Sequence, residues 1–167
     1  AQAAKENGLA AVWAQAKLNQ GVAAQKLGDV PGAMEHYREV PAHGGPTYSR
    51  AQANLGSLHA EAGDFEAALD ELTVALRAFA RYETPRNVAQ AASNLARLHL
   101  QLGDFARAAE LSAHAHKLAA SIGDKYLLAQ AALNLGTLAL EQGAAKVAQE
   151  QLAQARGSAG AVLECGR

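Results

Sequence analysis

The sequence is poor in residues that bring cross-links, membrane spans or strong charge. Its only cysteine is Cys165, so no disulfide can form within the chain, and a reducing compartment is favoured. No stretch approaches the roughly eighteen apolar residues of a membrane-spanning helix, and the N-terminus lacks the basic-then-apolar layout of a signal peptide. The net charge of −1 provides no overall attraction to nucleic acid or anionic lipid. We therefore expect a cytoplasmic protein with neither nucleic acid nor membrane as partner.

Aromatic residues are also scarce, at 5% of the chain, whereas alanine makes up about a quarter of it. Alanine is the best helix former and has the smallest side chain that can be buried apart from glycine. This composition predicts helices that pack closely and leave little room for an internal cavity.

The motifs of common enzyme sites are absent as well. No HExxH, GxSxG, Walker or GxGxxG pattern occurs, and no pair of carboxylates for acid–base catalysis can be identified. We expect a protein without enzymatic activity, catalytic residues, metal or cofactor.

What the sequence does contain is a long-period repeat of one asparagine and one glycine. Asn19, Asn54, Asn94 and Asn134 are separated by 35, 40 and 40 residues, and a glycine follows each of them nine positions later. These glycines are Gly28, Gly63, Gly103 and Gly143. A fixed period of this size indicates an array of structural repeats.

Each repeat is predicted to be a helical hairpin. Apolar residues fall three and four positions apart before the glycine and again after it, which is typical of two amphipathic helices. The glycine can end the first helix in the left-handed conformation, and the aspartate after it (Asp29, Asp64 or Asp104) can cap the second. Small residues recur where paired helices must approach closely: Gly21, Gly56, Ala96 and Gly136 on the first helices, and Ala33, Ala68, Ala108 and Ala148 on the second.

The segments between the repeats also have expected structures. Residues 41–46, which combine proline with paired glycines, are predicted to be a loop. Thr84-Pro85 is predicted to begin a helix, with the threonine as N-cap.

The recurring Leu-Gly, Gly-Asp-Phe and alanine pattern, best seen in Leu55-Gly56 with Gly63-Asp64-Phe65, resembles the tetratricopeptide repeat. The 40-residue spacing is most similar to the longer variant of kinesin light chains, Leu-Gly-Asn-type adaptors and bacterial regulatory proteins. The resemblance implies an all-α, right-handed superhelical solenoid of about four repeats, forming a single domain over residues 1–167. The expected units are residues 9–46, 47–84, 85–123 and 124–163.

The two ends suggest that the chain is part of a longer protein. It begins with Ala1 instead of methionine, and a fifth unit would start just after Arg167. The fourth unit lacks both the capping aspartate and the aromatic residue, and no polar capping helix follows it. We expect a fragment whose residues after about Gly157 fray or are buried against a second copy, so that a homodimer through the exposed terminal repeat is possible.

The asparagines define the expected binding surface. In a solenoid of hairpins the first helices line the concave face, and a row of amides there can bind an extended backbone or a carboxylate. The alternative is that these amides connect neighbouring helices. The expected groove residues are Asn19, Arg50, Asn54, Ser57, Gln90, Ser93, Asn94, Arg97, Gln130, Asn134 and Thr137.

Similar repeats that clamp the terminal carboxylate of chaperone tails pair such asparagines with lysine or arginine. Here Gln15 and Gln90 stand where that clamp would have lysines, and Asn94 stands where it would have arginine. A chaperone-tail clamp is therefore not favoured. His59 and His99 occupy the same position in adjacent repeats, too far apart to share a metal, and this recurrence favours a packing role.

These observations predict a protein-interaction scaffold that binds a partner peptide or protein segment in its groove. The alternative is a peptide-sensing or regulatory domain of a bacterial signalling or transcription protein. An attached DNA-binding or nucleotide-hydrolysing domain would favour the second. The partner, its direction in the groove and the oligomeric state do not follow from the sequence.

Overall fold

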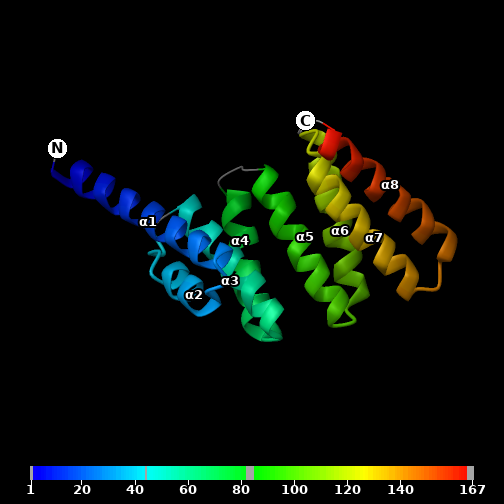
Figure 1. The fold of residues 1–167 in the computed structure, drawn as a ribbon, viewed down its shortest axis with the longest axis horizontal. Helices are drawn as coiled ribbons and strands as arrows, with labels where there is room; N and C mark the ends of the chain where they lie inside the picture. The colour runs from blue at the N-terminus through cyan, green and yellow to red at the C-terminus, as the bar shows by residue number, and fades with distance from the viewer. Residues whose placement is uncertain (1, 44, 82–84, 165–167) are drawn as a thin grey trace. The chain divides into compact units, whose positions relative to one another are not determined.

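The computed structural model describes residues 2–43, 45–81 and 85–164, and every regular element in them is an α-helix (Figure 1). The prediction of an all-α chain of antiparallel helix pairs, with about eight helices, is confirmed for these residues. Thr84 and Cys165 lie outside the described residues. The helices are α1 (Gln2–Lys26), α2 (Val30–Arg38), α3 (Pro46–Ala62), α4 (Phe65–Arg81), α5 (Pro85–Gln101), α6 (Phe105–Ser121), α7 (Lys125–Glu141) and α8 (Ala145–Glu164).

The helices fall into two compact units, Ala1–Tyr82 with α1–α4 and Glu83–Arg167 with α5–α8. In the first unit α1 packs on α2, α3 packs on α4, and α3 also contacts both helices of the preceding hairpin. The second unit repeats this scheme with α5, α6, α7 and α8. The prediction of one repeat domain over residues 1–167, with a right-handed superhelix, stays a prediction.

The hairpin turns have the local chemistry expected of them. Gly63 ends α3 at a φ of 81°, a left-handed conformation that is costly for a residue with a Cβ. Asp64 then caps α4, since its Oδ1 accepts a hydrogen bond from the Ala67 amide at 3.4 Å. Asp29 and Asp104 cap α2 and α6 in the same way. The predicted N-caps are therefore confirmed in all three hairpins that carry an aspartate.

A fourth cap was not predicted. Asp124 precedes α7, and its Oδ1 accepts hydrogen bonds from the Tyr126 and Leu127 amides, both at 3.1 Å. The other Asp124 oxygen, Oδ2, lies 3.0 Å from Arg86 Nη1 near the start of α5. Asp124 thus caps one first helix and links it to the first helix of the preceding hairpin.

The cores are built from leucine, alanine and a few aromatic residues. The four alanines predicted at the helix contacts, Ala33, Ala68, Ala108 and Ala148, are all buried. Tyr37 and Phe79 are buried as well, whereas Phe65 and Phe105, which directly follow the capping aspartates, are only half-buried. No helix in the described part of the chain has the length and apolar character of a membrane span.

Candidate functional site

All the predicted groove residues lie on the first helices of their hairpins. In the first unit Asn19 is on α1, and Arg50, Asn54 and Ser57 are on α3. In the second unit four are on α5 and three on α7, and there the structure brings them together. Those seven are Gln90, Ser93, Asn94 and Arg97 on α5, and Gln130, Asn134 and Thr137 on α7.

Three of these side chains form a closed amide network between α5 and α7. Gln90 Nε2 donates to Asn94 Oδ1 at 3.1 Å and to Gln130 Oε1 at 2.9 Å. Gln130 Nε2 donates in turn to Asn94 Oδ1 at 3.3 Å. Both hydrogens of the Gln90 amide are therefore used within the protein. The network keeps the two helices in register along the face where the groove was predicted.

Asn134 lies deeper and makes the helix-to-helix contact that was considered as the alternative. Its side chain is buried, and its Nδ2 donates to Ser93 O at 2.9 Å and to Ser93 Oγ at 3.2 Å. Ser93 is itself buried on α5. The Asn134 amide donors are thus directed at α5, and a role of this pair in ligand contact stays a prediction.

A shallow hollow of about 270 Å³ opens beside this pair, between α5 and α7. Three of the predicted residues, Arg97, Asn134 and Thr137, line it. The sequence reasoning missed its other four lining residues. They are Leu100, Gln101, Leu133 and Glu141.

Helical spacing could have identified most of the missed residues. Gln101 follows Arg97 by one turn, and Leu133 and Glu141 flank Thr137 by one turn each. The asparagine period does not identify them, because it marks one position in each repeat and not the other side chains one turn away on the same helix face.

The hollow combines exposed apolar surface with two opposite charges. Leu133, next to the buried Asn134, is 52% exposed. Arg97 and Glu141 line the same hollow. Neither of them takes part in the ion pairs found among the described residues. A partner can therefore bury an apolar side chain there and pair with one or both charges.

The predicted residues of the first unit have different surroundings. Asn19 is exposed, and its Oδ1 accepts a hydrogen bond from Gln15 Nε2 at 2.8 Å. Burial raises the pKa of the Tyr37 hydroxyl, and a hydrogen bond with Asn54 opposes that shift. Tyr37 also donates to Gln25 Oε1 at 2.9 Å. Arg50 is exposed, and Ser57 donates to the Ala53 carbonyl of its own helix.

The glutamines that replace the clamp lysines have a shared structural role. Gln15 donates to Asn19, and Gln90 donates to Asn94, in both cases to the residue one turn later. A lysine at these positions would present a free ammonium group, whereas each glutamine amide is bonded to the asparagine beside it.

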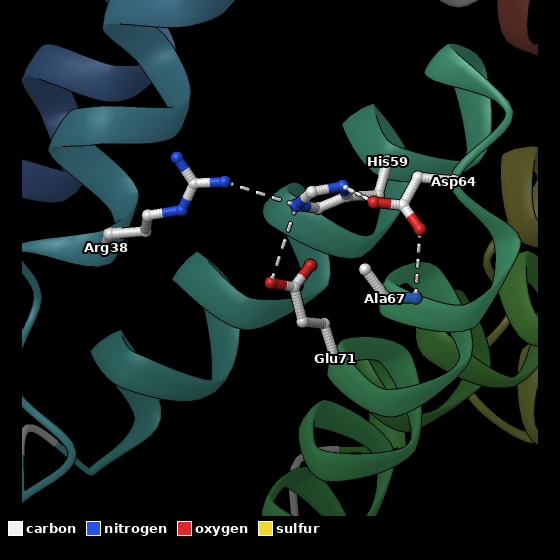
Figure 2. Close-up of polar contacts among 5 residues, drawn as sticks. All are labelled: Arg38, His59, Asp64, Ala67 and Glu71. Atoms are coloured by element: carbon white, nitrogen blue, oxygen red, sulfur yellow. Dashed lines mark hydrogen bonds and ion pairs between the residues drawn. The ribbon is translucent and has the colours of Figure 1, made fainter.

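The two histidines that recur in adjacent repeats each face the capping aspartate of the following helix. His59 Nδ1 lies 3.2 Å from Asp64 Oδ2, and His99 Nδ1 lies 3.3 Å from Asp104 Oδ2 (Figure 2 shows the first pair). Because the other oxygen of each aspartate caps the helix, the ring connects the end of the first helix to the start of the second. No group of three or more potential metal ligands is found in the described part of the chain.

The hairpins, their stacking and the face of amides on the first helices define a helical-repeat protein. Family models described as "Tetratricopeptide repeat" match residues 87–159 and residues 49–72. The chain belongs to the tetratricopeptide repeat family. No curated protein sequence matches it.

A solved structure with the same fold is BtubC (BKLC) from P. vanneervenii, with a TM-score of 0.78 and 20% sequence identity. The similarity covers 89% of this chain and 64% of that chain. This chain therefore spans less than two thirds of the length of that relative.

Proposed function

We propose that this protein is a scaffold without enzymatic activity that binds a segment of a partner protein across α5 and α7. The main observation behind this proposal is the hollow between these helices. It is lined by an exposed leucine, Leu133, and by two charged side chains that form no ion pair with any described residue. Tetratricopeptide repeats generally act as protein-interaction scaffolds, and this family membership supports the same function. The partner segment would cover Leu133 with an apolar side chain.

The charges suggest which residues flank that apolar side chain. Arg97 on α5 suits an acidic side chain or a terminal carboxylate, and Glu141 on α7 suits a basic one. The bonded amides of Gln90 and Gln130 lie on the same two helices and hold them at a fixed spacing. A preorganised surface of this kind lowers the entropy lost on binding.

Selection of a displayed library of random peptides on the full chain tests this proposal. Selected peptides are expected to contain an apolar residue next to an acidic one. Arg97→Ala should weaken their binding by roughly tenfold or more, since a hydrogen bond to a charged group contributes about 1.5–3 kcal/mol. Leu133→Asp should abolish binding.

Matched controls separate this surface from the rest of the protein. Lys117→Ala removes an exposed cation from α6, and Leu102→Asp places an acid on another exposed leucine, outside the hollow. Both variants should bind the selected peptides like the unmodified protein. Selected peptides that bind the Leu133→Asp variant with unchanged affinity would contradict the proposal.

Self-association remains a second proposed interaction. A hollow of about 480 Å³ lies between α7 and α8, with Leu140, Ala148 and Leu152 among its lining residues, and Val147 on α8 is 49% exposed. One repeat earlier, the equivalent second helix α6 is packed against α7. Sedimentation velocity of the unmodified chain and of Val147→Lys tests whether a second copy covers this face, and a concentration-independent monomer would refute it.

A further inference from the structure

The His59 ring lies where three helices of the first unit meet. His59 is on the last turns of α3, Arg38 approaches it from the end of α2, and two carboxylates approach it from Asp64, the N-cap of α4, and from Glu71 on α4 (Figure 2). Arg38 belongs to the first hairpin, whereas both carboxylates belong to the hairpin of His59 itself. The ring is therefore in contact with two hairpins at once.

The hydrogen-bonding capacity of arginine determines the tautomer of the neutral ring. Arg38 Nη2 lies 3.4 Å from His59 Nε2, and a guanidinium can only donate, so Nε2 must be the unprotonated, accepting nitrogen. The ring hydrogen is then on Nδ1, which lies 3.2 Å from Asp64 Oδ2. Arg38 and Asp64, the aspartate that caps α4, thus lie at opposite nitrogens of the same ring.

Glu71 stands on the other side of the same ring nitrogen. Its Oε1 lies 3.8 Å from His59 Nε2, too far for a hydrogen bond to the neutral ring, which has no hydrogen to donate there. Its Oε2 is buried and has no hydrogen-bond partner among the described residues. Burial raises the pKa of Glu71, while the charges of His59 and Arg38 lower it and those of Asp64 and Asp70 raise it.

We propose that His59 is a proton-operated switch between the two hairpins. The neutral ring accepts from Arg38 and so holds α3 to α2. The protonated ring carries a hydrogen on Nε2, cannot accept, and donates to Glu71, so that the bond passes to α4. Both arrangements use the same ring nitrogen, so the ring can bond to only one of the two partners at a time.

The surrounding charges favour this exchange. A protonated ring faces one cation, Arg38 on α2, and two carboxylates, Asp64 at the N-cap of α4 and Glu71 on α4, with Asp70 next to Glu71. Arg38 is exposed, so it can move into solvent when the ring becomes positive. On α1, Lys17 is paired with Glu39. Protonation therefore loosens the contact between the first and second hairpins and tightens the second hairpin.

The second unit contains a natural comparison. His99 stands 40 residues after His59 and faces Asp104 in the same way, but the residue 40 positions after Glu71 is Leu111. The His99 ring therefore has no carboxylate at the equivalent place to which Nε2 could donate. It keeps the contact with the helix cap and lacks the switch.

Nitrogen-15 imidazole NMR spectra of the full chain between pH 8 and 5 test the proposal. At pH 8 His59 should be the Nδ1–H tautomer. At pH 6 Glu71→Gln should reduce the protonated fraction of His59 by roughly twofold or more, because a nearby negative charge is lost. Arg38→Gln should increase that fraction, and neither variant should change the His99 signals.

Amide exchange, corrected for its intrinsic dependence on pH, tests the structural consequence. Residues 36–40 at the end of α2 should exchange several-fold faster at pH 5.5 than at pH 8, and Arg38→Gln should remove most of that difference. Far-ultraviolet circular dichroism checks that both variants keep their helices. The Nε2–H tautomer at pH 8, or a protonated fraction that Glu71→Gln leaves unchanged, would overturn the proposal.

Discussion

Gly56 of α3 lies directly against Leu72 of α4. A Cβ added to Gly56 would be 2.7 Å from Leu72 Cγ and 3.1 Å from the Leu72 backbone nitrogen. The same relation, sixteen residues apart, places Gly21 against Tyr37 and Gly136 against Leu152. In each of these hairpins, a side chain of the second helix occupies the space that a side chain at the glycine of the first helix would need.

The third hairpin follows the same rule with smaller residues. Ala96 replaces the glycine, and the residue sixteen positions later is Ser112 instead of a leucine or tyrosine. Both are buried. The residue on the first helix is larger than glycine and the residue on the second helix is smaller than leucine or tyrosine. The close packing of α5 and α6 therefore does not require a glycine.

Gly56→Ala should destabilise the first unit. Alanine favours a helix over glycine by about 1 kcal/mol, but overpacking a close contact costs about 1–3 kcal/mol. Because part of the contact is with the Leu72 backbone, a change of side-chain rotamer cannot relieve it. Urea unfolding measures the difference. Gly8→Ala in α1, where a Cβ would meet nothing within 4 Å, is the control and should be neutral or stabilising.

Ser112→Ala should leave the second unit as stable as before or make it more stable. The Ser112 hydroxyl is buried and has no hydrogen-bond partner among the described residues, and an unsatisfied buried group costs about 1–3 kcal/mol. Thermal unfolding would detect the gain. Ser112→Leu should be destabilising by itself, and adding Ala96→Gly should recover much of the loss by recreating the pairing of the other hairpins. A Ser112→Ala variant that unfolds well below the unmodified protein would show that the hydroxyl has a stabilising partner.

Asn134→Ala and Asn94→Ala should separate the two roles considered for the amide row. Asn134→Ala removes both donors to buried Ser93 and should cost about 1–3 kcal/mol of stability. If Asn94 contacts a partner, Asn94→Ala should lower peptide affinity more than it lowers the melting temperature. Both quantities are measured on each variant. Loss of stability with unchanged affinity for Asn94→Ala would assign it, like Asn134, to contacts between helices.

Stability of the second unit should fall in mild acid because of His99. Burial lowers the pKa of the His99 ring, and Asp104 opposes this only in part. The unfolded chain then takes up the proton first, so this contribution is complete above about pH 6.5 and is lost as the pH falls below it. One group contributes a slope of at most about 1.4 kcal/mol per pH unit. His99→Gln should flatten the dependence of the unfolding free energy on pH between pH 7 and 5.

The helices and their turns were predictable because they depend on local chemistry. Gly103 ends one helix and Asp104 caps the next, and neither role depends on what packs around them. The same pair of signals recurs with the period of the repeat. The small residues at helix contacts were predictable for a related reason, since only glycine or alanine fits between two closely packed backbones.

Which hydrogen bonds each asparagine of the row makes depends on distances between helices, and the period of the sequence does not contain those distances. Asn94 and Asn134 occupy the same position in successive repeats, yet Asn94 accepts from two glutamines at the surface and Asn134 is buried against Ser93. Ser93, the ninth residue of α5, decides the role of Asn134, because its backbone carbonyl and its hydroxyl both accept hydrogen bonds from the Asn134 amide.

The sequence by itself determined the fold class, the hairpin boundaries and the faces that pack, because helix periodicity, capping and side-chain volume act within a few residues. Only the tertiary structure decided which polar groups bond to one another within the described part of the chain and which charges are unpaired there. Arg97, Leu133 and Glu141 belong to two helices, and only the packing of α7 on α5 brings them to one hollow. The Nε2 atom of His59 likewise acquires its two possible partners from α2 and α4, which meet at the ring only when both hairpins are folded.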